Sequence, residues 1–263
     1  MPFDGRPSLV SFENSEFRYD PFPIGVVRGV FDAATYQRML REWPPLDKFK
    51  HFAKWGNKYS LSEFGKEREY HDFVRGSELW SRVHGEIKSA AFIERVIGFL
   101  ADKRIDLGLK GNWVPAGTGG LRLGQRLRAM ACGLMLKSNK TVQLSSYLEF
   151  SMLPSDGGCL RPHTDDPRKI ITLVFSIVGP DEWKREWGGG TAIVRPKDTA
   201  ANFNFLNRMV EFGETEEIGR YEFEPNQCIV FVKTFNSWHS VPPMKSGRPD
   251  VFRRSLTLNI EIA

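Results

Sequence analysis

The chain has 263 residues, of which 41% are hydrophobic and 13% aromatic, and its formal net charge is +5 at neutral pH. These values exclude a disordered chain and suit one large domain with a buried core. The basic charge is compatible with acidic partners such as carboxylates, phosphorylated metabolites or nucleic acid, but it does not select among them.

The cysteines and the lengths of the apolar runs indicate in which cellular compartment the protein lies. Cys132, Cys159 and Cys228 are widely spaced and form neither a CxxC pair nor a zinc-type cluster, which favours reduced thiols. The N-terminus lacks a signal-peptide pattern, and the longest apolar runs, such as 170–178, are too short to span a bilayer. We therefore expect a cytoplasmic protein without a membrane segment.

The first part of the chain, residues 1–120, is expected to be mainly helical. A turn at 20–23 leads into a short strand, and Asp32 is a candidate N-cap for a helix over 33–43. That helix would have one apolar face, made of Tyr36, Met39, Leu40 and Trp43. A second helical zone is predicted over 77–100, whereas 46–76 has no clear period.

After a Gly/Pro-rich stretch at 111–120, hydrophobic residues recur with period two. This pattern predicts short strands at 121–128, 130–137, 142–150, 169–178, 191–195, 228–232 and 252–262. Helices followed by many short strands indicate an α+β fold, with an antiparallel sandwich or barrel and N-terminal helices packed against it. We expect a single domain over 1–263, with a β core over 121–263 and a partly helical insertion near 198–220.

Two of the five histidines lie where a metal site would place them. His163 and Asp165 are separated by one residue, so on an extended segment their side chains point to the same side. His239 comes after the apolar strand 229–232. Two imidazoles and one carboxylate are the facial triad of iron(II) oxygenases, which leaves the opposite face of the metal open. An isolated HxD tripeptide is more often an exposed loop, so the hypothesis depends on the residues beyond His239.

The strand after His239 carries a second constellation. Arg253, Ser255, Thr257 and Asn259 share one face, and Arg254, Leu256, Leu258 and Ile260 share the other. The planar guanidinium of arginine pairs bidentately with a carboxylate, so Arg253 with Ser255 suits a dicarboxylate ligand. A solvated basic pair at a strand start is the alternative interpretation.

Taken together, residues 147–262 resemble the prolyl-4-hydroxylase-like branch of the Fe(II)/2-oxoglutarate-dependent oxygenases. The resemblance rests on the HxD pair, the glycines 188–190 before a strand, His239, and the Arg253-Arg254-Ser255 sequence. It implies a double-stranded β-helix core of the jelly-roll or cupin-like type, with N-terminal helices packed against it. It also implies Fe(II), 2-oxoglutarate and O₂, and hydroxylation of a C–H bond with release of succinate and CO₂.

The resemblance also assigns roles to individual residues. His163, Asp165 and His239 would hold the iron at the catalytic centre, and Arg253 with Ser255 would bind the distal carboxylate of 2-oxoglutarate. Tyr147, Thr172 and Ser176 are further candidates for lining the cosubstrate pocket, with a structural role equally open. The Pro-rich loop 242–249 is longer than in the family, which leaves open whether Arg253 or Arg254 points inward.

Two other functions are compatible with parts of the sequence. A nucleic-acid demethylase of the same chemistry would carry a second arginine six residues after the first, but positions 259 and 260 are Asn and Ile. A cupin-like binding protein without activity is disfavoured by the intact triad. Over 103–140 basic residues predominate, and Arg122, Arg126 and Arg128 share one side of a predicted strand. That side is either a solvated outer face or a surface for an anionic substrate, which would be a small molecule, or a residue or sugar on a larger one.

Overall fold

The computed structural model describes residues 7–109, 113–115 and 142–263. The strands predicted at 121–128 and 130–137, and the basic side formed by Arg122, Arg126 and Arg128, lie outside the described residues. Within the described ranges, no helix is long and apolar enough to cross a membrane.

The described part of the N-terminal region contains four α-helices: α1 (Ala33–Arg41), α2 (Glu67–Arg75), α3 (Glu78–Ile87) and α4 (Ala90–Asp102). The Asp32 carboxylate accepts a hydrogen bond from the Thr35 backbone N–H at 3.0 Å, which confirms the predicted N-cap of α1. The helical zone predicted over 77–100 is two helices, because the Ser89 hydroxyl accepts from the Phe92 N–H and starts a new helix. Helix α2 lies where the sequence showed no clear period.

The same region also contributes strands, namely β1 (Ser15–Arg18), β2 (Ile24–Arg28), β3 (Lys50–Phe52), β4 (Lys58–Ser62) and β5 (Trp113–Pro115). Strands β1 and β2 extend one side of the main sheet and β4 and β3 extend the other, while β5 pairs with the start of β6. The described residues of this region, 7–109 and 113–115, are therefore less purely helical than the pattern of 1–120 predicts.

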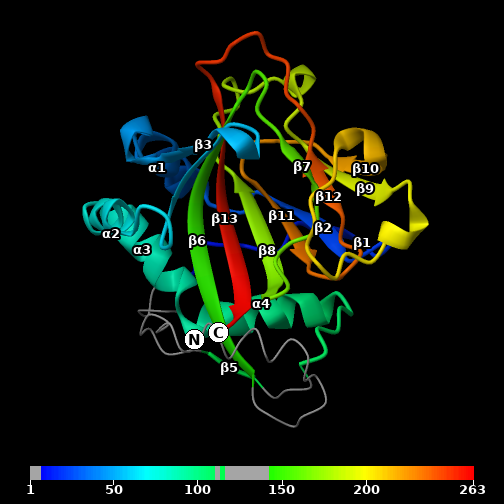
Figure 1. The fold of residues 1–263 in the computed structure, drawn as a ribbon. Helices are drawn as coiled ribbons and strands as arrows, with labels where there is room; N and C mark the ends of the chain where they lie inside the picture. The colour runs from blue at the N-terminus through cyan, green and yellow to red at the C-terminus, as the bar shows by residue number, and fades with distance from the viewer. Residues whose placement is uncertain (1–6, 110–112, 116–141) are drawn as a thin grey trace.

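The remaining strands form the core. They are β6 (Val142–Pro154), β7 (Leu160–His163), β8 (Lys169–Ser176), β9 (Thr191–Pro196), β10 (Thr215–Tyr221), β11 (Gln227–Val232), β12 (His239–Val241) and β13 (Phe252–Ile262). The large sheet has the order β1-β2-β11-β8-β13-β6-β4-β3, and the small sheet has the order β10-β9-β12-β7. The helices pack on one side of the large sheet, and the small sheet lies on the other (Figure 1). This arrangement confirms the α+β fold with a double-stranded β-helix core.

The insertion near 198–220 contains less helix than predicted. It has two short 3-10 turns, η4 (Thr199–Ala201) and η5 (Phe212–Glu214), and then strand β10, which pairs with β9. Its second part therefore completes the small sheet and is part of the core.

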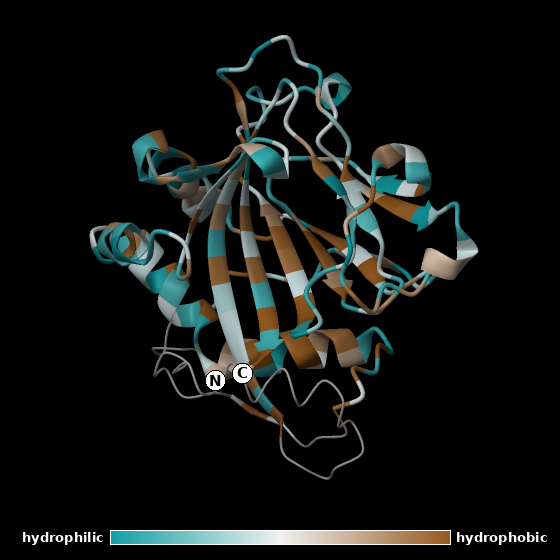
Figure 2. Ribbon diagram, viewed as in Figure 1, coloured by the Kyte–Doolittle hydropathy of each residue, from teal (hydrophilic) through white to brown (hydrophobic). Residues whose placement is uncertain are grey.

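Side chains alternate between two environments along the central strands, and Figure 2 shows β6, β13 and β8 banded accordingly. On β13, Leu256, Leu258 and Ile260 are fully buried among the side chains of the helices. The intervening polar residues face the space between the two sheets, where Arg253 is only 4% exposed. The large sheet thus presents an apolar face to the helices and a polar face to the interior.

Candidate metal and cosubstrate site

A cavity of about 210 Å³ lies between the two sheets. Strands β6, β8 and β13 supply one wall, and β7 and β12 supply the other. The predicted residues His163, Asp165, His239, Thr172, Arg253 and Ser255 all line this cavity.

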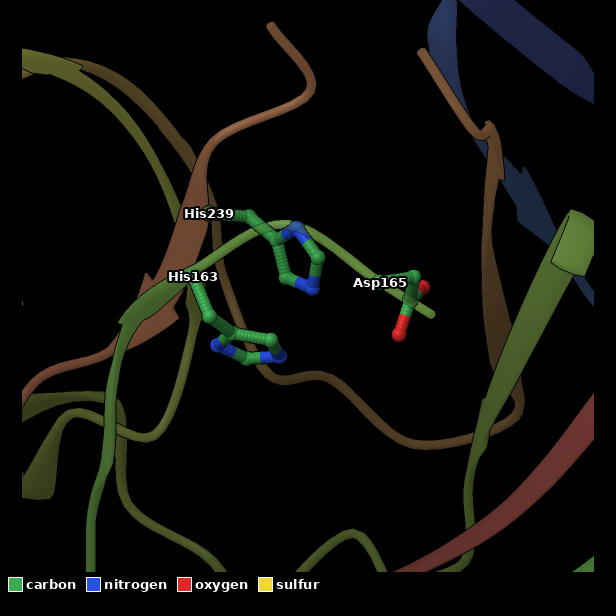
Figure 3. Close-up of side chains that lie close together, drawn as sticks. All are labelled: His163, Asp165 and His239. Atoms are coloured by element: carbon green, nitrogen blue, oxygen red, sulfur yellow. The ribbon is translucent and has the colours of Figure 1, made fainter. Parts of the chain in front are cut away.

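The three predicted metal ligands converge at one end of the small sheet (Figure 3). His163 ends β7 and His239 begins β12, and the two residues are antiparallel register partners, with ring centroids 4.5 Å apart. Asp165 lies in the loop after β7. One ligand atom from each of the three side chains lies within 4.8 Å of the others. The pairing of β7 with β12 thus brings His163 and His239 together although they are far apart in the sequence.

Backbone contacts orient both imidazoles. His163 Nδ1 lies 2.7 Å from the Arg161 carbonyl oxygen, and His239 Nδ1 lies 2.9 Å from that of Ser237. A protonated Nδ1 donates to each carbonyl, which leaves Nε2 as the lone-pair donor for a metal. Burial lowers the pKa of His163 to about 3 and also lowers the pKa of His239. Both rings are therefore neutral near pH 7, as metal binding requires.

The carboxylate of Asp165 is held by two donors. The Thr172 hydroxyl donates to Oδ2 at 2.8 Å, and the Lys169 ammonium donates to Oδ1 at 2.8 Å. Burial by itself would raise the pKa of Asp165, but the charge of Lys169, the neighbouring His239 and His163 and the hydrogen bond from Lys169 together outweigh burial, and the pKa is lowered. Thr172 lines the cavity as predicted, and its hydroxyl contacts a metal ligand.

Two neutral imidazoles and one ionised carboxylate on one side of a cavity fit Fe(II) well. This donor set suits non-haem iron, and the rest of the cavity gives the open coordination positions that an oxygenase needs. Asp165 and His239 are buried and His163 is partly buried, and each of the three side chains has a hydrogen-bond partner that fixes its orientation.

Arg253 lies in the same cavity without an anionic partner. Its Nε donates to the Gly189 carbonyl at 2.6 Å, its Nη1 lies 3.4 Å from Ser255 Oγ, and its guanidinium lies 4.3 Å from the ring centroid of Phe223. Burial alone lowers the pKa of Arg253 to about 10, and no carboxylate among the described residues offsets it. A buried cation of this kind is stabilised by a bound anion. Arg254 instead pairs with Glu182 on the other side of the strand.

The backbone beside Arg253 leaves no room for a side chain. Gly189 has φ +84°, and a Cβ there would come within 2.8 Å of the Trp183 ring and 3.3 Å of Arg253 Cδ. Gly188 has the same φ, but a Cβ there would meet nothing within 4 Å. We expect Gly189→Ala to displace Arg253 and to raise the Kd for 2-oxoglutarate at least about tenfold, equivalent to about 1.4 kcal/mol.

Gly188→Ala is the matched control in a calorimetric titration with 2-oxoglutarate. It carries the same backbone strain without the contact to Arg253, so its Kd should stay close to that of the wild type. Equal weakening in both variants would show that strain in the turn, and not the position of Arg253, sets the affinity.

Two of the residues predicted from the sequence lie elsewhere. Tyr147 is not among the residues that line the cavity. Its ring packs against Phe64, with centroids 4.6 Å apart, and lies 4.8 Å from the Lys88 ammonium. Ser176 is buried and does not line the cavity either.

Several residues line the cavity without having been predicted from the sequence. Lys58 on β4 forms an ion pair with Glu149 on β6 at 2.8 Å, and Trp55 and Met209 are exposed where the cavity opens. The alternation along β6 places Glu149 on the polar face, which is a signal that could have identified it. Lys58 and Trp55 come from a short hairpin without a period, so no comparable signal existed for them.

A comparison with models of protein families agrees with this site. Residues 142–261 match the model of the 2OG-Fe(II) oxygenase superfamily, whereas no curated protein sequence matches the chain significantly. Similar solved structures include a prolyl-4-hydroxylase from Pseudomonas putida, with 14% identity, a TM-score of 0.49 and coverage of 91% of this chain and 92% of that one. Another is the non-haem α-ketoglutarate-dependent epimerase SnoN of nogalamycin biosynthesis, with 15% identity, a TM-score of 0.48 and coverage of 94% and 79%.

These structural likenesses are distant and say nothing about the substrate. The family match covers the strands that carry all three metal ligands and both residues of the Arg253–Ser255 pair. Residues 142–261 are identified by this match as a 2OG-Fe(II) oxygenase segment, and the protein is a 2-oxoglutarate-dependent dioxygenase that uses Fe(II), 2-oxoglutarate and O₂.

Proposed function

We propose that this dioxygenase hydroxylates a C–H bond of an anionic substrate, with release of succinate and CO₂. The substrate would be a small molecule, or a residue or sugar on a larger one. The observation that carries the proposal is that Arg253, a buried guanidinium that no carboxylate of the described residues pairs with, lines the same cavity as His163, Asp165 and His239.

Different residues of the cavity would bind the metal, bind the cosubstrate and exclude water. His163, Asp165 and His239 would hold Fe(II), which when bound supplies the activation of O₂. Arg253 would pair with the distal carboxylate of 2-oxoglutarate and so fix the distance of the cosubstrate from the metal. Apolar lining residues such as Phe231, which is 2% exposed and lies against His239, would keep water from the reacting atoms.

The charge of the cavity supports an anionic substrate. The lining carries four cationic side chains against two carboxylates; these are Lys58, Arg161, Lys169 and Arg253 against Glu149 and Asp165. The two charges of Fe(II) are balanced by the two carboxylates of 2-oxoglutarate. The loaded site therefore keeps an excess of positive charge, which favours an anionic group on the substrate. Lys169 and Lys58, each of which also pairs with one of these two carboxylates, are the candidates to meet it.

A metabolite screen tests this function. Iron-dependent succinate formation would be measured with pools of anionic, neutral and cationic metabolites, and products would be analysed for the mass gain of one oxygen. We expect stimulation from an anionic pool together with such a product. Stimulation only by neutral or cationic metabolites would contradict the charge argument, and oxidation without oxygen insertion would contradict hydroxylation.

A further inference from the structure

An apolar patch lies on the surface next to the cavity. It consists of Phe203, Phe205, Leu206, Met209 and Phe235, which are between 41% and 70% exposed. The ring of Phe205 is 4.5 Å from that of Phe235 and 6.3 Å from that of Phe203, measured between centroids, so these three rings form one continuous surface. Contiguous exposed apolar surface of this kind marks a binding site more often than chance.

The loop that carries the apolar patch is firmly held. Asn204 is only 6% exposed, and its side chain donates to the Arg208 carbonyl and accepts from the Arg208 N–H, both at 2.8 Å. The Asn204 backbone N–H donates to the Phe235 carbonyl at 2.7 Å, which joins the two segments of the patch. The aromatic side chains are thus presented to solvent by an ordered loop, which reduces the entropic cost of binding a ligand.

The same loop is tied to the residues that precede two metal ligands. Trp238, next to His239, donates from Nε1 to the Asn202 carbonyl at 2.9 Å. The Val210 N–H donates to the carbonyl of Pro162, which precedes His163, at 3.0 Å. Figure 1 shows this segment in yellow beside the small sheet. The apolar patch is therefore fixed relative to the metal site.

Met209 connects the apolar patch to the interior, because it belongs to the patch and also lines the cavity. Trp55, which is 55% exposed, also lines the cavity but comes from the β3–β4 hairpin. These two exposed side chains mark the place where the cavity opens. Met209, four residues after Phe205 in the same loop, is thus the residue that the apolar patch and the cavity lining share.

The size of the cavity limits what can be enclosed. Its volume of about 210 Å³ is below the roughly 300–1,000 Å³ of sites that enclose a drug-sized ligand. The cavity must also hold 2-oxoglutarate. A substrate larger than a few atoms beyond its reacting carbon must therefore extend through the mouth.

We propose that the apolar patch binds an apolar chain or ring system of the substrate, while the anionic end enters the cavity. The inference rests on the proposed function and narrows its substrate to an anionic amphiphile. The patch is made only of Phe, Leu and Met side chains, which offer no hydrogen bonds to a peptide backbone. Protein–protein hot spots, by contrast, are rich in Trp, Tyr and Arg. The chemistry of the patch thus fits a hydrocarbon surface better than a protein partner.

The test uses sodium octanoate and sodium dodecanoate, below micelle-forming concentration, as probes of the intact enzyme. Both are titrated by calorimetry into anaerobic enzyme with saturating Fe(II) and 2-oxoglutarate, which keeps the probes away from Arg253. Each further buried methylene should tighten binding up to about fourfold, from about 0.8 kcal/mol per methylene. We expect dodecanoate to bind at least about tenfold more tightly than octanoate, and Leu206→Ser to remove most of that difference.

The matched control is Leu46→Ser, since Leu46 is an exposed leucine outside the cavity lining and the apolar patch. It should leave both affinities unchanged. Equal weakening by both substitutions, or no effect of Leu206→Ser, would overturn the inference. Self-association of the wild type that Leu206→Ser abolishes would also overturn it, because the patch would then be an interface between copies.

The two proposals fail separately in this design. If the wild type does not bind 2-oxoglutarate, the proposed function fails. Dodecanoate titrated into the protein without cosubstrate would still test whether the apolar patch binds a hydrocarbon chain. If 2-oxoglutarate binds normally and Leu206→Ser does not change dodecanoate binding, only the inference about the patch is refuted.

Discussion

Arg253→Ala is expected to raise the Kd for 2-oxoglutarate at least about a hundredfold, whereas Arg254→Ala should change it only slightly. The guanidinium of Arg253 is buried and unpaired by any described carboxylate, so a carboxylate bound there would lose its charged partner. Removing one side of a desolvated ion pair costs about 3–5 kcal/mol. The measurement is a calorimetric titration of each variant with 2-oxoglutarate under anaerobic conditions.

Arg254 is a close control because it is the next residue on the same strand. It pairs with Glu182 at the surface, and its removal should affect folding only modestly. If Arg254→Ala instead produced the larger loss, the cosubstrate would be bound from the opposite face of β13. The observed strand register would then not describe the active enzyme.

Asp165→Ala is expected to abolish 2-oxoglutarate turnover and to weaken Fe(II) binding by more than about a hundredfold. Substitution of a residue that only hydrogen-bonds to a metal ligand typically lowers metal affinity about 10–100-fold, and this substitution removes the ligand itself. It also leaves the buried Lys169 ammonium without its partner at 2.8 Å. Iron affinity would be measured by anaerobic titration, with circular dichroism as a check on the fold.

Asp166→Asn serves as the control for this variant. Asp166 is the adjacent carboxylate, but it pairs with Arg168 near the surface and does not line the cavity. It should keep iron affinity and turnover close to the wild type. An Asp165→Ala enzyme with full iron affinity would refute the assignment of the metal site.

The sequence predicted well which side chains share a face of a central strand, because strand alternation is a strong local signal. On β13 it separated Arg253 and Ser255 from Leu256 and Leu258, and the structure has the two sets on opposite faces. Asn259, which takes the place of the second arginine of a nucleic-acid demethylase, lies with Oδ1 3.0 Å from the Thr172 hydroxyl. Nothing in the described structure thus favours the demethylase alternative.

Other features had no local signal. Strands β1 to β4 have five residues or fewer, too few to establish a period, and β2 and β4 join the large sheet by pairing with β11 and β6, far away in the chain. The same holds for the Lys58–Glu149 pair, since the register between β4 and β6 cannot be read from either segment alone. Tyr147 lies on the polar side of β6, but contacts with Phe64 and Lys88, distant in sequence, determine its position.

The positions of strands β2 and β4 in the large sheet determine where the chain can be truncated. The family match begins at residue 142, but the strands that cover β11 and part of β6 on either side of the large sheet come from residues 15–62. A fragment starting at 142 would keep every metal ligand and yet expose unpaired backbone amides and carbonyls along β11 and β6. Open strand edges of this kind template aggregation. We therefore expect that residues 142–261 do not fold alone, and that fusion or truncation designs must retain the strands that precede them.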